Sequence, residues 1–173
     1  MLPPPRIVAG LATPERRRYA AGLAVAPRRG LLRISTGRQD APTAPSAPEP
    51  LSLTRDRDDV ERFVIDVDVD VDVLHLDIVT RTPPAPIVCV VDAGHLLEDL
   101  RDPSPLDEHR TDGDGDTGAR ARRAVALLEA ATLISFVRWE RVETAELSVL
   151  MALASHLAPR ARVRLSRGPA EDL

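Results

Sequence analysis

Carboxylates that follow apolar residues are the side chains best placed to do chemistry. Asp66, Asp68, Asp70 and Asp72 alternate with valines, and in an extended chain this spacing puts all four carboxylates on one face. Carboxylates this close repel each other unless they face water or a cation. Two interpretations therefore stay open: a strand that leaves the sheet with a wet acidic face, or a site for a divalent cation.

A second acidic segment, residues 110–118, has part of the spacing of a calcium-binding loop. A loop of that kind needs glycine at its sixth position and a bidentate acid at its twelfth. The chain has Thr117 and Arg123 at these positions. We therefore expect a flexible acidic loop here.

Composition limits the classes of protein that the chain can belong to. Its 173 residues suit a single domain over 1–173. All 23 basic residues are arginines, so a mechanism that needs lysine is excluded, and the net charge of −4 argues against a nucleic-acid partner. No apolar run approaches the length of about 20 residues that a membrane helix needs. The N-terminus does not resemble a signal peptide, so we expect no membrane association and a cytoplasmic protein.

The remaining candidates for covalent or metal chemistry are few. Cys89 is the only cysteine and lies in the apolar run "IVCVV", which predicts a buried small hydrophobic residue. The four histidines lack the spacing of a zinc site. We therefore assign no catalytic residue.

The elements that must position these residues are short apolar strands alternating with helices, the pattern of an α/β protein with a mostly parallel sheet. A helix is expected to begin near Thr13, with Thr13 as its N-cap and Pro14 in its first turn. Segments of about 36–56 and 102–118 are expected to be flexible, and 74–80 is either a strand or a short helix. The expected strands are 6–9, 30–35, 62–65, 85–93, 132–137 and 161–166, and the later helices are 119–131 and 144–157.

Two phrases of the chain resemble a known family. "PIVCVVDAGHLLEDL" and "ALLEAATLISFVRWERVETAELSVLMALASHLAPRARV" are similar to the CobW-type group of P-loop GTPases, which are linked to metal delivery and cobalamin synthesis. The resemblance covers about 85–166, and "RIVAGL" and "ERFVID" extend it more weakly. It implies a three-layer, P-loop NTPase-like sandwich that binds GTP and Mg²⁺. The family's cysteine-rich motif has no counterpart in this sequence, and we expect its additional C-terminal domain to be absent.

The phosphate-binding motif of the family is altered. In register with G-x-x-x-x-G-K-[ST], only Gly10 matches, because Glu15, Arg16 and Arg17 replace the second glycine, the lysine and the hydroxyl residue. Glu15 adds a negative charge where phosphate belongs, and arginine does not simply replace lysine in a tight loop. Losing these contacts removes most of the phosphate-binding energy, although Arg16 or Arg17 could retain weak anion binding.

The other nucleotide motifs are also changed. The guanine-reading motif N-K-x-D of the family aligns with Val137, Arg138, Trp139 and Glu140. Only the acid at the final position is therefore kept. The resemblance makes Arg138 and Glu140 candidates for weak nucleotide binding and Asp66 a candidate ligand for Mg²⁺.

We therefore predict a CobW-like homologue that has lost GTPase competence and acts through contacts with an unidentified protein partner, with a link to metal homeostasis. One alternative is weak binding of Mg²⁺ and a nucleotide by a residual GTPase. The other is a plain interaction module, such as a homodimer formed through a sheet edge or the helix 144–157.

Overall fold

The computed structural model describes residues 6–25, 30–34, 63–69, 71, 73, 76, 85–104 and 119–169. The expected flexible segment 36–56 and the part of 102–118 from 105 onward lie outside the described residues, as does most of 74–80. The acidic loop at 110–118 lies outside them too.

The described elements follow the predicted alternation of strands and helices. In chain order they are β1 (Arg6–Ala9), α1 (Thr13–Val25), β2 (Gly30–Ile34), β3 (Phe63–Val67), β4 (Ile87–Asp92), α3 (Leu96–Arg101), α4 (Arg120–Ala130), β5 (Leu133–Val137), the 3-10 helix η2 (Trp139–Arg141), α5 (Thr144–Leu157) and β6 (Arg162–Leu165).

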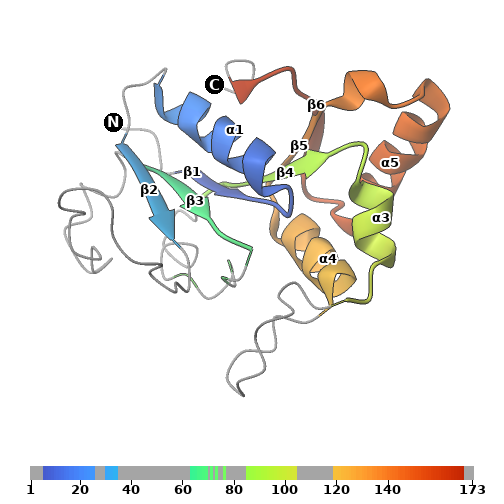
Figure 1. The fold of residues 1–173 in the computed structure, drawn as a ribbon, viewed down its shortest axis with the longest axis horizontal. Helices are drawn as coiled ribbons and strands as arrows, with labels where there is room; N and C mark the ends of the chain where they lie inside the picture. The colour runs from blue at the N-terminus through green and yellow to red at the C-terminus, as the bar shows by residue number, and fades with distance from the viewer. Residues whose placement is uncertain are drawn as a thin grey trace.

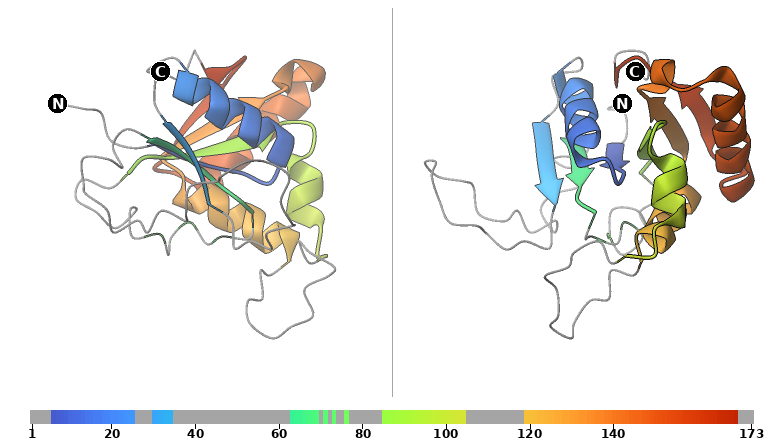
Figure 2. Two further views of the ribbon diagram at one scale, coloured as in Figure 1. Left: turned by 60° about the vertical axis from the view of Figure 1, so that its left-hand side comes forward. Right: turned by 45° about the vertical axis from the view of Figure 1, so that its right-hand side comes forward.

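The six strands form one sheet in the order β2-β3-β1-β4-β5-β6, and all neighbouring strands run parallel. α1 covers one face of the sheet, and α4 and α5 cover the other (Figure 1). Figure 2 shows the sheet between α1 and α4 in its left-hand view. These layers confirm the predicted three-layer α/β sandwich and are consistent with a P-loop NTPase-like architecture.

Alternating residues of the central strands supply the two halves of the core. On β4, Val88 and Val90 pack with α1, whereas Ile87, Cys89 and Val91 face the helices of the opposite layer. All six residues of β4 are buried, which is the expected environment of a strand covered on both faces. Burial of the thiol raises the pKa of Cys89 to about 12, and the prediction of a buried hydrophobic role is confirmed.

The helix starts differ slightly from the sequence prediction. Ala12 accepts the first helical hydrogen bond of α1 from the Arg16 N–H, so Thr13 lies inside the helix rather than capping it. The predicted helix 144–157 is confirmed as α5, and its N-cap residue is Glu143. Pro14 does occupy the first turn of α1, where its missing N–H costs no helical hydrogen bond. The short helix α3 was not predicted from the sequence.

The aspartate repeat does not continue as a strand. β3 ends at Val67, and the Val71 N–H donates to the Asp68 carbonyl in a turn. Asp66 is fully buried, so the expected wet acidic face is wrong at this position. Asp70 and Asp72 lie outside the described residues.

Candidate functional site

The chemistry-bearing side chains gather at the carboxyl edge of the sheet, the edge at which all six parallel strands end. The connections that leave β1 and β4 run toward opposite sides of the sheet, because β2 and β5 lie on opposite sides of this pair. In open α/β sheets, ligands bind outside the carboxyl ends of strands at such a switch point. The predicted site residues should therefore meet here.

The connection from β1 to α1 contains three residues, Gly10, Leu11 and Ala12. Gly10 has a φ of +149°, and a Cβ atom on it would lie 2.2 Å from the carbonyl oxygen of Val90. The glycine is therefore required for close packing against β4. A phosphate loop needs a longer run of backbone N–H groups that point at one centre, and here the chain is already helical from Thr13 onward.

Arg16 fills the space under this connection. Its side chain is fully buried: Nε donates to Asp66 Oδ1 at 2.7 Å, Nη1 to the Gly10 carbonyl at 3.0 Å, and Nη2 to Asp68 Oδ1 at 2.9 Å. The guanidinium thus ties the start of α1 to the end of β3 and to the connecting loop. Such a buried cation is tolerated only because charged and polar partners surround it.

Asp66 is occupied on both carboxylate oxygens. Arg16 Nε holds Oδ1, and Arg33 Nε on β2 lies 3.0 Å from Oδ2. Two guanidinium groups therefore stand where Mg²⁺ would have to bind, so these residues do not fit that ion. Among the described residues, no group of three or more His, Cys, Asp or Glu side chains is arranged to hold a metal ion.

Asp68 completes this cluster, which we call the Arg16 cluster: Arg16, Arg17, Arg33, Asp66 and Asp68. Arg17 is half-exposed and reaches Asp68 Oδ2 at 3.6 Å. Partial burial raises the pKa of Asp68. The hydrogen bond from the Val69 N–H and the charges of Arg16 and Arg17 together lower the same pKa by a larger amount. The net result is a pKa below the ordinary value of 3.8, so the carboxylate is ionised at neutral pH.

A second charged cluster joins β4, β5 and α1. Arg138 Nη1 lies 3.0 Å from Glu15 Oε1 and 3.1 Å from Asp92 Oδ2. Arg138 has a left-handed backbone, with a φ of 57°, which turns the chain from β5 into η2. Asp92 also accepts a hydrogen bond from the Gly94 N–H and contacts His95 Nδ1 at 3.0 Å. The acid that follows "VV" in the sequence therefore contacts both Arg138 and His95 at the strand end.

A cavity of about 230 Å³ lies beside this second cluster, between α1, the end of β5 and the segment after β6. We call it the arginine cavity, because its charged lining consists of four arginines and two glutamates: Arg18, Arg138, Arg141, Arg167, Glu15 and Glu140. Tyr19 and Ser166 also line it.

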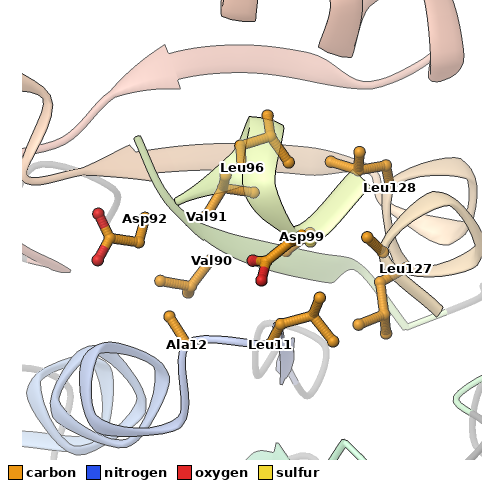
Figure 3. A pocket seen from close by; sticks show the side chains of 11 residues that line it. Leu11, Ala12, Val90, Val91, Asp92, Leu96, Asp99, Leu127 and Leu128 are labelled. Carbon is orange, nitrogen blue, oxygen red and sulfur yellow. The ribbon is translucent and has the colours of Figure 1, made fainter. Parts of the chain in front are cut away.

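A smaller cavity lies at the switch point between β1 and β4. It is bounded by Leu11 after β1, Val90 and Asp92 of β4, and Leu127 of α4, with Asp99 of α3 on one side (Figure 3). Its volume is about 20 Å³, which is room for about one water molecule.

The structure divides the predicted site residues into two groups. Gly10, Arg16, Arg17 and Asp66 meet at the ends of β1 and β3, and Arg138 and Glu140 line the arginine cavity. Glu15, the replacement for the second glycine of the motif, reaches across to the second group through Arg138.

Several of these residues were not predicted as site residues, among them Arg33 and Arg167. Arg33 contacts Asp66 only because β2 pairs with β3, and Arg167 follows the last strand, where the sequence shows no motif. The sequence did contain an indication that Asp92 lies at the site, because this acid ends the apolar run of β4.

No protein-family model, curated protein or solved structure matches the chain. None of the helices in the described part of the chain has the length and apolar character required to cross a membrane.

Proposed function

We propose that the chain is a CobW-like pseudo-GTPase, a GTPase-type scaffold whose phosphate site is filled by its own arginine and which acts through contacts with other proteins. One observation carries the proposal: the Arg16 guanidinium is fully buried between the Gly10 carbonyl, Asp66 and Asp68. It takes the place of both the lysine that contacts phosphate and the cation that the acid of β3 would hold.

The cost of displacing Arg16 favours a closed site. Binding of a phosphate here would require Arg16 to leave two carboxylates, and breaking a buried ion pair costs about 3–5 kcal/mol. Glu15 would also lie against the incoming negative charge, while its own partner is Arg138. A ligand would bind only if its own contacts offset both the broken ion pairs of Arg16 and the repulsion by Glu15.

Isothermal titration of the nucleotide-free protein with GTP and Mg²⁺ tests the proposal. The triple variant Glu15→Gly, Arg16→Lys, Arg17→Thr restores G-x-x-x-x-G-K-[ST] in register with Gly10. We expect no binding heat from the natural chain and measurable heat from the triple variant. Arg17→Thr alone is the matched control, because it changes one motif position in α1 without releasing Asp66.

The same titration distinguishes the alternatives. GTP-selective binding by the natural chain that disappears in Asp66→Ala would favour the residual Mg²⁺-dependent GTPase instead. A GTP turnover rate of the natural chain comparable to that of active GTPases would overturn the proposal. A triple variant that keeps its circular dichroism spectrum but gains no binding would remove the argument for P-loop descent.

The proposed protein contacts have three candidate surfaces, the two edges of the sheet and the exposed side of α5. β2 and β6 are the edge strands of the described sheet, and Val149 on α5 is 57% exposed. A homodimer through an edge or through α5 is one such contact, and light scattering across a concentration series tests it. The link to metal homeostasis is supported only by the resemblance over 85–166.

A further inference from the structure

His95 lies at the carboxyl edge of the sheet, with its imidazole in contact with a buried carboxylate. It connects β4 to α3, and its Nδ1 atom lies 3.0 Å from Asp92 Oδ2. His95 stands at the N-cap position of α3, but its side chain makes no capping hydrogen bond there. The imidazole is therefore held by Asp92 and not by the helix that follows it.

Asp92 is fixed in the orientation that this contact needs. Its side chain is 4% exposed. The Gly94 N–H donates to Oδ1 at 3.1 Å, and Arg138 Nη1 lies 3.1 Å from Oδ2. With a donor on each oxygen, the carboxylate cannot rotate away from His95 without losing one of these contacts. An acceptor held in this way fixes both the tautomer and the orientation of the imidazole.

The contact decides which nitrogen of His95 is free to react. A carboxylate only accepts hydrogen bonds, so Nδ1 is the donor and carries the ring proton. The neutral imidazole then keeps its free electron pair on Nε2, the nitrogen that does not contact Asp92. The side chain of His95 is 53% exposed, so a molecule in solution can reach it. An imidazole oriented by a carboxylate behind it is the arrangement that activates histidine as a base or a nucleophile.

Stability of the fold gives little reason for this pair. A half-exposed contact of this kind contributes at most about 1 kcal/mol. The other acids of the segment also leave His95 accessible to an anion. Asp99, whose N–H donates to the His95 carbonyl, is paired with Arg120 at 2.6 Å, and Glu98 is exposed, so that solvent screens its charge.

From this arrangement we propose that His95 accepts a phosphoryl group on Nε2. Arg138 shares one Asp92 oxygen with His95, and its side chain is 36% exposed. A guanidinium, the group that best matches phosphate oxygens, is therefore a neighbour of the imidazole. Donors of the matching chemical class are phosphoramidates and acyl phosphates. The proposal goes beyond the pseudo-GTPase function and does not depend on it, since His95 lies outside the Arg16 cluster.

Transfer from phosphoramidate balances without an added acid or base. The electron pair of His95 Nε2 attacks phosphorus, the P–N bond of the donor breaks, and its electron pair leaves on the nitrogen. In the zwitterionic donor this nitrogen already carries its protons, so it departs as ammonia. The imidazole ring becomes positively charged and keeps its Nδ1 proton, and the Asp92 carboxylate stabilises that charge.

Labelling with phosphoramidate tests the proposal within one molecule. The full chain is incubated with phosphoramidate at pH 8, and phosphohistidine is located and quantified by peptide mass spectrometry without acid. His156 on α5 is the internal control, because it is exposed and has no carboxylate partner within the described part of the chain. We expect His95 to be labelled about tenfold faster than His156, the size of effect typical of an orienting carboxylate. In urea, where the contact with Asp92 is lost, the two rates should be equal.

Three variants assign the roles. His95→Gln should remove the fast labelling and leave the rate at His156 unchanged, whereas His156→Gln is the matched control and should leave the rate at His95 unchanged. Asp92→Asn should lower the rate at His95 to about that of His156 without changing the latter, as expected for a positioning residue. Far-ultraviolet circular dichroism checks that each variant retains the fold.

Equal rates at His95 and His156 in the folded natural chain would overturn the proposal. Fast labelling of His95 that persists in urea would also overturn it, because the neighbouring sequence and not the fold would then be the cause. The same holds for fast labelling in a folded Asp92→Asn variant. The comparison of the folded and unfolded natural chain needs no substitution, so it decides the question even if Asp92→Asn does not fold.

Discussion

The Arg16 Nε atom lies 2.7 Å from Asp66 Oδ1, and both side chains are fully buried although 50 residues separate them in the sequence. The pair connects the first turn of α1 to the last part of β3. It gives the protein an internal cation where the β1–α1 connection meets the end of β3.

Loss of one partner should destabilise the fold strongly. Asp66→Asn leaves the buried Arg16 guanidinium without its closest counter-ion, and we expect the free energy of unfolding to fall by about 3–5 kcal/mol. Urea unfolding followed by circular dichroism measures the change. Arg17→Gln is the control and should cost less than about 1 kcal/mol, since its contact with Asp68 is half-exposed and 3.6 Å long. Equal costs in the two variants would contradict the structural role of the buried pair.

Acid should weaken the same cluster through Asp68. Its pKa is lower in the folded chain than its ordinary value of 3.8, so the unfolded chain binds the proton more readily. The stabilisation is therefore complete above that value and is lost as the pH falls through the lower, folded pKa. Unfolding free energies measured from neutral to acidic pH should decline less steeply in Asp68→Asn than in the natural chain.

The control for this pH series is Glu129→Gln, which removes an exposed carboxylate at the end of α4. Its pH dependence should match that of the natural chain. If Asp68→Asn and the natural chain lose stability in parallel, Asp68 is not a source of the acid sensitivity.

Gly10 should not accept a side chain. Alanine at this position would place its Cβ 2.2 Å from the Val90 carbonyl oxygen and keep a φ of +149°, so we expect a cost of at least about 2 kcal/mol. Gly168→Ala is the matched control, because no atom lies within 4 Å of its Cβ position. Thermal unfolding of both variants measures the difference, and similar melting temperatures would disprove the close approach of the loop to β4.

The Cys89 thiol should be inert in the folded protein. It is 2% exposed, and burial raises its pKa to about 12, so almost no thiolate forms at pH 8. A disulfide reagent such as dithionitrobenzoate should react completely in denaturant and hardly at all under native conditions. Rapid labelling of the native chain would show that β4 is not a central buried strand.

Much of the fold was predictable from local patterns. The run at 85–93 predicted β4 because apolar β-branched residues suit a strand covered on both faces, and the helix 144–157 matches α5. The predicted wet acidic face of the aspartate repeat was wrong at Asp66, because periodicity alone cannot tell where a strand leaves its sheet. Among the described residues, β3 pairs with β2 up to Val67 and with β1 up to Asp66, and the chain then turns at Asp68.

The site was predictable as a set of residue types but not as an arrangement. The sequence predicted Arg16 as a site residue, and the residue type alone does not show whether an arginine faces a ligand or the protein interior. It faces Asp66, because α1 starts only three residues after β1 and carries Arg16 inward. The ion pair between Glu15 and Arg138 could not be predicted either, because 123 residues separate the two in the sequence.

The sequence by itself determined the alternation of strands and helices, the absence of lysine and the burial of Cys89, because these depend on residue type and on spacing over a few positions. Only the tertiary structure decided which charges meet. Contacts between residues far apart in the chain arise from the strand order and from the short β1–α1 connection, and these place Arg16 against Asp66 and gather the arginines around one cavity.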